Sequence, residues 1–243
     1  MDASELLDSG PVRIAVVGTG TDVGKTHLSV ALLHALTRLG VSAVGLKPVE
    51  SGVDGGQSSD GVSDTARLAA AGMFHVKHPA PYRFPDPVSP HLAARRHGVE
   101  IAPTRILDWV TACAAPWTVV ETAGGLLSPL ARSYTNLDLV RLLAPDVVLL
   151  VGVDRLGALH DVAACRLALS TLAPALREPH VVLQSPAVND SSTGTNAAEL
   201  SFLGLAAEVT VVPRGASTEP SVLEAALALV ARIQARRAVE RFT

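Results

Sequence analysis

The sequence predicts an α/β protein with a single doubly wound, mostly parallel sheet flanked by helices, the three-layer arrangement of phosphate-loop NTPases. Three observations support this fold class. Short apolar strands alternate along the chain with helical segments, most of them longer than about eight residues. The 243 residues are 48% hydrophobic but only 3% aromatic, which suits a core of Ala, Val and Leu around strands buried on both faces. A glycine-rich loop joins the first strand to the first helix.

The individual elements can be predicted in chain order. Strands are expected at residues 12–17, 41–46, 119–121, 147–153, 181–183 and 209–212. Helices are expected at residues 27–39, 64–71, 91–97, 104–115, 135–143, 159–172, 195–203 and 220–239. Gly40 is expected to cap the first helix, and Thr104 is expected to be the N-cap of its own helix.

Two stretches are expected to lack regular structure. Residues 51–63 are rich in Gly, Ser and Asp, which predicts a surface loop, and residues 78–90 contain five prolines, which predicts an irregular backbone. The chain has no internal repeat, charge block or linker that would divide it. One nucleotide-binding domain is therefore expected over residues 1–243.

Composition limits the partners and the compartment. A net charge of -3 gives no basic footprint for nucleic acid. Cys113 and Cys165 have neither disulfide nor zinc spacing, which indicates a reducing cytoplasm. The segment Met1–Glu5 carries two acids and no basic residue, unlike a signal peptide, and no apolar run approaches the roughly 18 residues of a membrane span. A cytoplasmic protein without membrane or nucleic-acid partners is expected.

The loop GTGTDVGKT at residues 18–26 carries the clearest chemistry. Its glycines allow backbone N–H groups to face a polyphosphate, and the helix that follows adds unpaired N–H groups and a positive dipole end. Lys25 is expected to reach the terminal phosphates of a nucleoside triphosphate, and the Thr26 hydroxyl to contact Mg²⁺. Gly18 and Gly24 enclose five residues rather than the usual four, so this is a lengthened loop. The alternative is a glycine-rich turn before an ordinary helix.

Polar residues follow the carboxyl ends of the other strands, where open α/β sheets bind ligands. The second strand is followed by Lys47 and Ser51, and the third ends at Glu121 and runs into the pair Gly124-Gly125. Later strands are followed by Asp154 and the turn 156–160, and by Gln184 and Ser185. A lysine and carboxylates beside a phosphate loop are what a magnesium–nucleotide site needs.

Each of these residues also has an ordinary structural interpretation. Lys47 could be a solvated residue at a strand end, and Glu121 an exposed acid or a helix-capping partner. Asp64 could simply be the N-cap of its helix. His91 could be a core or surface histidine without a chemical role.

The spacing of these residues resembles the dethiobiotin synthase family. The lengthened loop is similar to the family pattern G-T-x-T-[ED]-V-G-K-T, and KPVESG at 47–52 is similar to K-P-[VI]-x-[ST]-G. Further similarities are SD at 63–64, PVSPH at 87–91, VETAGG at 120–125 and, loosely, LGALH at 156–160. The resemblance covers roughly residues 13–160 and weakens after them. Several motifs in order are far more specific than the phosphate loop alone.

The resemblance implies a cyclo-ligase of biotin biosynthesis. The family converts 7,8-diaminononanoate, CO2 and ATP into dethiobiotin, ADP and phosphate. One substrate amine captures CO2 as a carbamate, the carbamate attacks the γ-phosphate to give a carbamic–phosphoric anhydride, and the second amine closes the ureido ring. Such catalysis relies on positioning and charge stabilisation.

The resemblance also implies roles for individual residues. Lys25, Lys47 and Thr21 would be catalytic, and Thr26, Asp64 and Glu121 would hold Mg²⁺. The residues implied to contact ATP are Asp22, Val23, Gly24, Lys25, Thr26, His27, Gln184 and Pro213. Those implied to contact the diamine, its carbamate or its distal carboxylate are Thr21, Asp22, Ser51, Gly124, Gly125, Leu156, Gly157 and His160. In this family the turn corresponding to 156–160 comes from a second subunit, which implies a homodimer.

Four departures from the family pattern concern the site. Asp22 stands where Glu is frequent, and Thr122 replaces a common glycine, which puts any positive φ there in doubt. Asp154 and Arg155 lengthen the approach to the 156–160 turn by one residue, and His160 stands where Asn is usual. Near the base, Gln184 replaces the Asn of members that prefer ATP, Pro186 fixes the backbone next to it, and residues 213–215 follow the last strand on the other side. Base selectivity is therefore left open.

Three other functions fit parts of the sequence. A cobalamin-pathway amidoligase shares the loop, but such enzymes usually carry a glutaminase domain. A partition or positioning ATPase shares the fold, but tends to have an extra lysine early in the loop, where this chain has Thr19, Gly20 and Thr21. A family member that lost activity is suggested by Thr122 and His160.

Overall fold

A central six-stranded sheet organises the molecule, with strand order β10-β9-β8-β1-β5-β2 and every neighbouring pair parallel. This is a computed structural model, and it describes residues 10–53, 61–74, 76 and 78–240. The strands are β1 (Val12–Gly18), β2 (Ala43–Leu46), β5 (Trp117–Glu121), β8 (Val147–Val153), β9 (His180–Gln184) and β10 (Val209–Val212). The predicted fold class is confirmed, and all six predicted strands are present.

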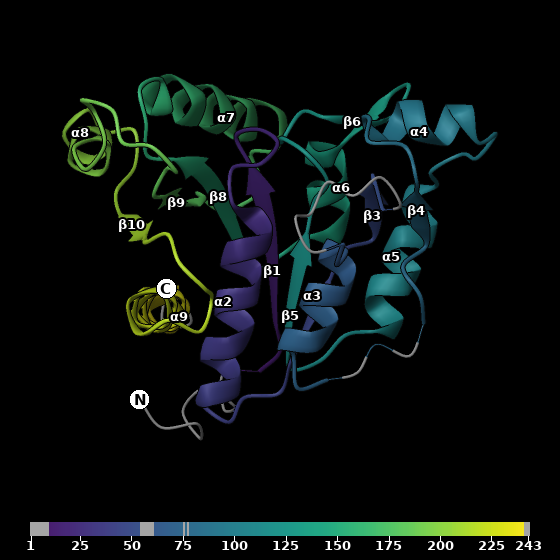
Figure 1. Cartoon of the computed structure of the whole chain (residues 1–243), viewed down its shortest axis with the longest axis horizontal. Coiled ribbons are helices and arrows are strands. Elements are labelled where there is room, and N and C mark those ends of the chain that lie inside the picture. The colour runs from purple at the N-terminus through teal and green to yellow at the C-terminus, as the bar shows by residue number, and fades with distance from the viewer. Residues whose placement is uncertain (1–9, 54–60, 75, 77, 241–243) are drawn as a thin grey trace.

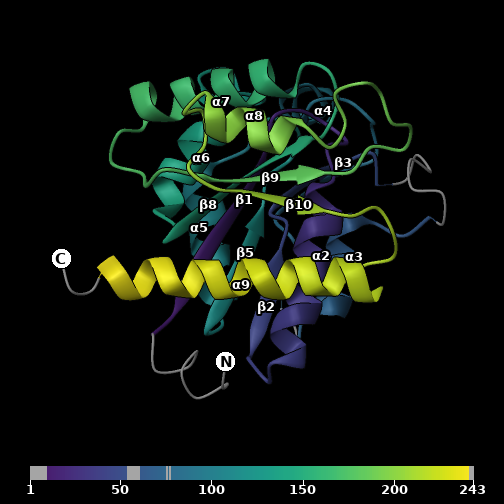
Figure 2. The ribbon, with the colours of Figure 1, turned by 90° about the vertical axis from the view of Figure 1, so that its left-hand side faces the viewer.

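Helices cover both faces of this sheet (Figure 1, Figure 2). One face packs against α2 (Lys25–Arg38), α3 (Asp64–Ala71) and α9 (Pro220–Glu240). The other face packs against α4 (Pro90–Arg96), α5 (Pro103–Ala112), α6 (Asn136–Leu143), α7 (Ala158–Leu172) and α8 (Asn196–Phe202). Figure 2 shows the sheet between α9 on one side and α7 and α8 on the other.

The strand β1 shows why the sheet needs two helical layers. Ile14 and Val16 belong to the core shared with α2 and α9, whereas Ala15 and Val17 belong to the core shared with α6 and α7. All four side chains have no exposed surface. Successive residues of a strand point to opposite faces, so a strand that is apolar throughout must be covered on both sides.

Two small sheets were not predicted. The strand β3 (Val49–Ser51) pairs in parallel with β4 (Tyr82–Phe84), and β6 (Pro129–Ala131) pairs antiparallel with β7 (Tyr134–Thr135). Strands of two or three residues are too short for a period-two pattern to be visible. The first pair fixes part of the proline-rich segment, which was expected to be irregular.

Helix ends confirm one predicted cap and correct another. Gly40 has φ 71°, and the N–H groups of Gly40 and Val41 donate to carbonyls of the last turn of α2, as in a glycine C-cap. The prediction of Thr104 as an N-cap was wrong, because α5 begins at Pro103 and its N-cap is Ala102. Proline suits the first helical position, where its missing N–H would be unpaired in any case.

Some predictions concern residues that the structure does not describe. The segment Met1–Glu5 lies outside the described residues, and so do positions 54–60 of the predicted loop at 51–63. Within the described part of the chain, no helix is both long enough and apolar enough to span a bilayer.

Candidate active site

The predicted phosphate loop lies between β1, which ends at Gly18, and α2, which begins at Lys25. Asp22 and Gly24 have φ values of 56° and 90°, which places both residues in the left-handed region. A Cβ atom on Gly18 would come within 2.7 Å of the Gly20 carbonyl oxygen, so the start of the loop has no room for a side chain. The strand–loop–helix context that the motif requires is therefore present.

The Lys25 side chain folds back over this loop. Its Nζ donates to the Gly20 carbonyl at 3.0 Å, and the residue is 6% exposed. Burial lowers the pKa of Lys25 to about 8, although the nearby Glu121 carboxylate acts in the opposite direction. Among the described residues, this ammonium hydrogen-bonds to a neutral carbonyl and forms no direct ion pair, so an incoming phosphate would supply a close counter-charge.

Four predicted residues from different elements are joined by hydrogen bonds beside the loop. The Thr26 hydroxyl donates to Glu121 Oε1 at 2.7 Å, and Lys47 Nζ donates to the same oxygen at 2.8 Å. Lys47 also forms an ion pair with Asp64, the first residue of α3. The structure therefore places the predicted residues at the ends of β2 and β5 next to those at the starts of α2 and α3.

Burial rules out a solvent-exposed position for two of these residues. Glu121 has no exposed surface and Lys47 is 7% exposed, so neither is a solvated surface charge. Burial alone would lower the pKa of Lys47, but the carboxylates of Glu121 and Asp64 outweigh it and raise that pKa above its ordinary value. Asp64 is not an N-cap, because Ser63 occupies that position and accepts from the Ala66 N–H at 3.2 Å.

The donors around Glu121 fit a phosphate-bound Mg²⁺ ion. Glu121 Oε2 is a buried carboxylate oxygen with no hydrogen-bond partner among the described residues. Nowhere in the described part of the chain do three or more His, Cys, Asp or Glu side chains form a group that could hold a metal ion. Mg²⁺ is usually held by one or two carboxylates together with substrate phosphates and waters, and the oxygens of Thr26, Asp64 and Glu121 fit that requirement.

A cavity of about 540 Å³ opens over this cluster. It lies at the carboxyl ends of β1, β2 and β5, in the position that open α/β sheets use for ligands. The predicted site residues that line it are Thr21, Asp22, Gly24, Lys25, Thr26, His27, Lys47, Ser51, Asp64, Glu121 and Gly124. The proline-rich segment 87–90 forms another part of the wall, which sequence reasoning did not assign to the site.

The turn after β5 is held by a residue that sequence reasoning missed. The buried Asn136 donates through Nδ2 to the carbonyls of Ala123 at 2.6 Å and Gly125 at 2.8 Å. Gly124 has φ 76°, and a Cβ atom there would meet Ser128 Oγ at 2.7 Å. Gly125 packs against the phosphate loop, because its Cβ would lie 3.2 Å from the Cα of Gly20.

Two further residues near the site have roles that the sequence did not indicate. Thr122 is not among the described residues with positive φ, and its hydroxyl donates to the Val16 carbonyl at 3.2 Å, so this departure needs no left-handed backbone. Glu50, which is 5% exposed, accepts from the Asp64 N–H at 2.7 Å and from the Thr65 hydroxyl at 2.5 Å. Glu50 thereby holds the start of α3, where Asp64 lies. Its place in KPVESG was the only available signal.

The predicted base-contacting residue, Gln184, is turned toward the phosphate loop. A Cβ atom on Gly24 would lie 2.6 Å from Gln184 Cγ, so the glutamine packs directly on that glycine. Gln184 Oε1 lies 2.9 Å from Nδ1 of His27, and Nε2 of His27 lies 3.0 Å from the Gly215 carbonyl. Gln184 Nε2 is buried without a partner among the described residues. Pro213 is half-buried after β10, in the same neighbourhood, and Val23 is a buried core residue.

The predicted carboxylate-binding turn does not reach this cavity. Leu156, Gly157 and His160 precede or begin α7, and none of them lines the cavity. The Leu156 N–H, one of the groups expected to bind the substrate carboxylate, donates instead to Asp190 Oδ2 of the same chain at 2.7 Å. His91 also lies outside the cavity lining, with Nδ1 3.0 Å from Ser89 Oγ.

Asp154, which follows the same strand, has a structural role. It is 2% exposed and accepts from the Gly194 N–H at 2.9 Å and from Asn196 Nδ2 at 2.7 Å. Its carboxylate thus ties the end of β8 to the start of α8.

Comparison with known proteins gives a consistent family assignment. A family model described as an AAA domain matches residues 12–212. The ATP-dependent dethiobiotin synthetase of Anaeromyxobacter dehalogenans is 36% identical over 88% of this chain and 93% of its own length. That of Caulobacter sp. is 36% identical over 86% of this chain and 90% of its length. That of Aromatoleum aromaticum is 40% identical, but the match spans only 59% of this chain and 65% of that protein.

Solved structures show the fold shared more widely. A ParA family ATPase from Chlorobium tepidum superposes with a TM-score of 0.52 over 92% of both chains, at 12% identity. A plasmid partition protein from Borrelia burgdorferi gives a TM-score of 0.54 over 92% of this chain and 99% of its own, at 11% identity. At such identities the likeness concerns the fold alone.

Proposed function

Because the chain belongs to the dethiobiotin synthetase family, we propose that it is an ATP-dependent ligase of biotin biosynthesis that closes the ureido ring of dethiobiotin. The substrates would be 7,8-diaminononanoate, CO2 and ATP, and the products dethiobiotin, ADP and phosphate. The 243 residues would act as one nucleotide-binding domain in the cytoplasm. The observation that carries the proposal is the buried Lys47, which lies between two carboxylates beside the phosphate loop.

The proposed chemistry begins with phosphoryl transfer to a carbamate. Lys25 neutralises the transferring γ-phosphate, since the hydrogen-bond partner of its buried ammonium within the described part of the chain is a neutral carbonyl. Lys47 stabilises the carbamate and the phosphate as they approach each other, and Thr21, which also lines the cavity, contributes to this step. Anhydride formation releases ADP, and attack by the second amine expels phosphate and closes the ring.

Mg²⁺ would supply charge neutralisation for the β- and γ-phosphates when it is bound. Thr26, Asp64 and Glu121 hold it in this proposal. Thr26 and Lys47 both donate to Glu121 Oε1, which leaves Oε2 as the carboxylate oxygen without a partner among the described residues.

The proposal places the diamine and its carbamate beside the phosphate loop. Thr21, Asp22 and Ser51 line the cavity and offer hydroxyl and carboxylate oxygens to the two amines. Gly124 and Gly125 allow the substrate chain to pass close to the backbone. The distal carboxylate would be received by the turn 156–160 of a second subunit, which makes the working enzyme a homodimer.

One assay tests the proposed reaction. The purified chain is incubated with Mg²⁺, ATP, bicarbonate and 7,8-diaminononanoate, and dethiobiotin is detected by mass while ADP is quantified. We expect ADP release to depend on both the diamine and bicarbonate. ATP hydrolysis that ignores the diamine, or that needs glutamine as a nitrogen donor, would overturn the proposal and favour another phosphate-loop enzyme.

A further inference from the structure

Glu50 lines the active-site cavity, yet the proposed reaction gives it no role. It is the middle residue of β3, between Val49, which is buried in the core, and Ser51. Successive side chains of a strand point to opposite faces, so Glu50 is directed away from the core that holds Val49. Because Glu50 is only 5% exposed, its carboxylate depends on partners within the protein.

The partners of this carboxylate are the first residues of α3. Oε1 accepts from the Asp64 N–H at 2.7 Å, and Oε2 accepts from the Thr65 hydroxyl at 2.5 Å and from the Thr65 N–H at 3.4 Å. The Ser63 hydroxyl accepts from the next N–H group, that of Ala66, at 3.2 Å. The first N–H groups of a helix have no partner within the helix, so Glu50 satisfies two that would otherwise be unpaired. Its negative charge also suits the positive end of the helix dipole.

The short segment from Lys47 to Glu50 therefore holds Asp64 at both ends. Lys47 forms an ion pair with the Asp64 carboxylate, and Glu50 accepts from the Asp64 N–H. The Asp64 side chain is 36% exposed and lines the cavity, so core packing does not fix its position. One contact on the main chain and one on the side chain thus define where this carboxylate lies.

The pairing of β3 with β4 gives Glu50 a firm base. Tyr82 and Phe84 of β4 are buried, and they pair with the residues on either side of Glu50. Arg83 stands opposite Glu50, with Nε 3.9 Å from Oε2, but its side chain is 45% exposed, so this ion pair contributes little. Glu50 therefore projects from an anchored strand, and can hold the start of α3 at a fixed distance from the core.

We propose that Glu50 is a positioning residue of the magnesium site, which places the Asp64 carboxylate for the ion by holding the Asp64 N–H. The inference rests on the magnesium site of the proposed function. Residues that orient a metal ligand from behind typically change metal affinity by about ten- to hundredfold. Because Glu50 acts through hydrogen bonds to α3, the length of its side chain and its accepting oxygen matter more than its charge.

Three substitutions separate position from charge. Glu50→Met keeps the size of the side chain but removes both accepting oxygens. Glu50→Gln removes the charge but keeps an oxygen for the Asp64 N–H, and its amide nitrogen can donate to the Thr65 hydroxyl. Glu50→Asp keeps the charge but withdraws the carboxylate by one methylene group.

Metal affinity is measured without turnover. The full-length protein is saturated with AMPPNP, a non-hydrolysable ATP analogue, and titrated with Mn²⁺, whose free concentration is followed by its EPR signal. Glu50→Met should raise the Kd for Mn²⁺ by about ten- to hundredfold, and Glu50→Gln by no more than about threefold. Glu50→Asp should fall between them. The affinity for AMPPNP in EDTA should match the parent in all three variants, because the phosphate loop is unchanged.

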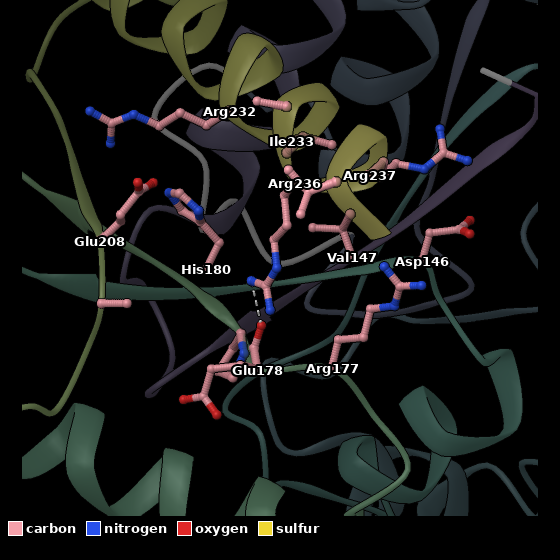
Figure 3. Close-up of a pocket in the computed structure, with 14 residues that line it drawn as sticks. Asp146, Val147, Arg177, Glu178, His180, Glu208, Arg232, Ile233, Arg236 and Arg237 are labelled. Carbon is pink, nitrogen blue, oxygen red and sulfur yellow. Dashed lines mark hydrogen bonds between the residues drawn. The ribbon is translucent and has the colours of Figure 1, made fainter. Parts of the chain in front are cut away.

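The matched control is Glu208→Met, which also removes one carboxylate. Glu208 is exposed and lines a different cavity, of about 410 Å³, at the amino ends of β8 and β9 (Figure 3). The phosphate loop follows the carboxyl end of β1, at the opposite end of this parallel sheet. The control should therefore leave the Kd for Mn²⁺ unchanged.

Several results would overturn the inference while leaving the proposed function in place. Parent-like Mn²⁺ affinity in Glu50→Met would show that Glu50 does not support the metal site. Tight binding in Glu50→Asp with weak binding in Glu50→Gln would show that charge acts rather than position. Loss of AMPPNP affinity in EDTA would show a general structural role. Absence of Mn²⁺ binding in the parent would instead overturn the proposed magnesium site, and this inference with it.

Discussion

The Lys47 ammonium lies 2.8 Å from a carboxylate oxygen of Glu121, a side chain with no exposed surface. Two neighbouring strands deliver this pair: Glu121 ends β5, which pairs with the phosphate-loop strand β1, and Lys47 follows β2, which pairs with the other side of β5. A buried ion pair contributes little net stability by itself, but removing one partner leaves a buried charge uncompensated. Replacing one of the two residues should therefore lower the stability of the protein much more than replacing both.

Replacing Lys47 should separate catalysis from folding. Lys47→Met is expected to abolish dethiobiotin formation and to lower the free energy of unfolding by about 3–5 kcal/mol, because Glu121 is left buried without its counter-charge. Urea unfolding followed by circular dichroism measures the second effect. The double variant Lys47→Met, Glu121→Gln should regain most of the stability but none of the turnover. Normal turnover in the single variant would show that Lys47 has no catalytic role.

Replacing Lys25 should abolish turnover without lowering the free energy of unfolding. Its ammonium is buried against a carbonyl and its pKa is lowered, so the protein without nucleotide gains little from the charge. Lys25→Met is expected to leave the free energy of unfolding unchanged or to raise it by about 1 kcal/mol, while abolishing turnover. It should also remove the stabilisation by Mg²⁺-ATP, which for the parent is about 2.7 kcal/mol at a hundredfold excess over Kd. A variant that ATP still stabilises fully would contradict the assigned phosphate contact.

The buried His180 predicts a loss of stability in mild acid. Its pKa is about 4 in the folded chain, below the ordinary value of 6.5, so the unfolded chain binds the extra proton between these pH values. Stability is therefore intact above pH 6.5 and falls as the pH drops toward 4, and at pH 5 the cost is about 2 kcal/mol. His180→Gln should remove this part of the pH dependence, measured as unfolding free energies at pH 7 and pH 5. Parallel curves for variant and parent would contradict it.

Motif spacing predicted the site residues that lie at strand ends and helix starts. Lys25, Thr26, Lys47, Asp64 and Glu121 were each placed at a strand end or a helix start, and parallel strands bring such ends to one edge. This topology explains why the five residues lie close together. The same argument could not say that Lys47 contacts both carboxylates, because that depends on side-chain directions.

The supporting residues could not be predicted because their contacts depend on local turns. Asn136 begins a helix, and nothing in its spacing indicates that its amide holds the carbonyls of Ala123 and Gly125. Glu50 is a polar residue in a motif, yet it is buried and accepts from the first N–H group of α3. The contacts of Gln184 with Gly24 and His27 were not predicted either, and its expected contact with the base stays a prediction.

The contact between His27 and Gln184 gives the last prediction, which concerns base selectivity. Nε2 of His27 faces the Gly215 carbonyl, an acceptor, so Nε2 must carry hydrogen. The Nδ1 atom of a neutral imidazole is then itself an acceptor and needs a donor, which the Gln184 amide can provide through its nitrogen. Amide oxygen and nitrogen are assigned from such partners, so the hydrogen-bonding pattern favours turning the amide over from its present orientation.

In that orientation the Gln184 oxygen becomes the atom without a partner. It can accept from the exocyclic amino group of adenine or cytosine but not from the carbonyl of guanine or uracil. We therefore expect kcat/KM to be higher with ATP and CTP than with GTP and UTP. In His27→Leu the amide can turn freely, and the preference should fall by about three- to tenfold, the value of one hydrogen bond. His34→Leu, on the same helix, is the matched control, and an unchanged preference in His27→Leu would show that His27 does not orient Gln184.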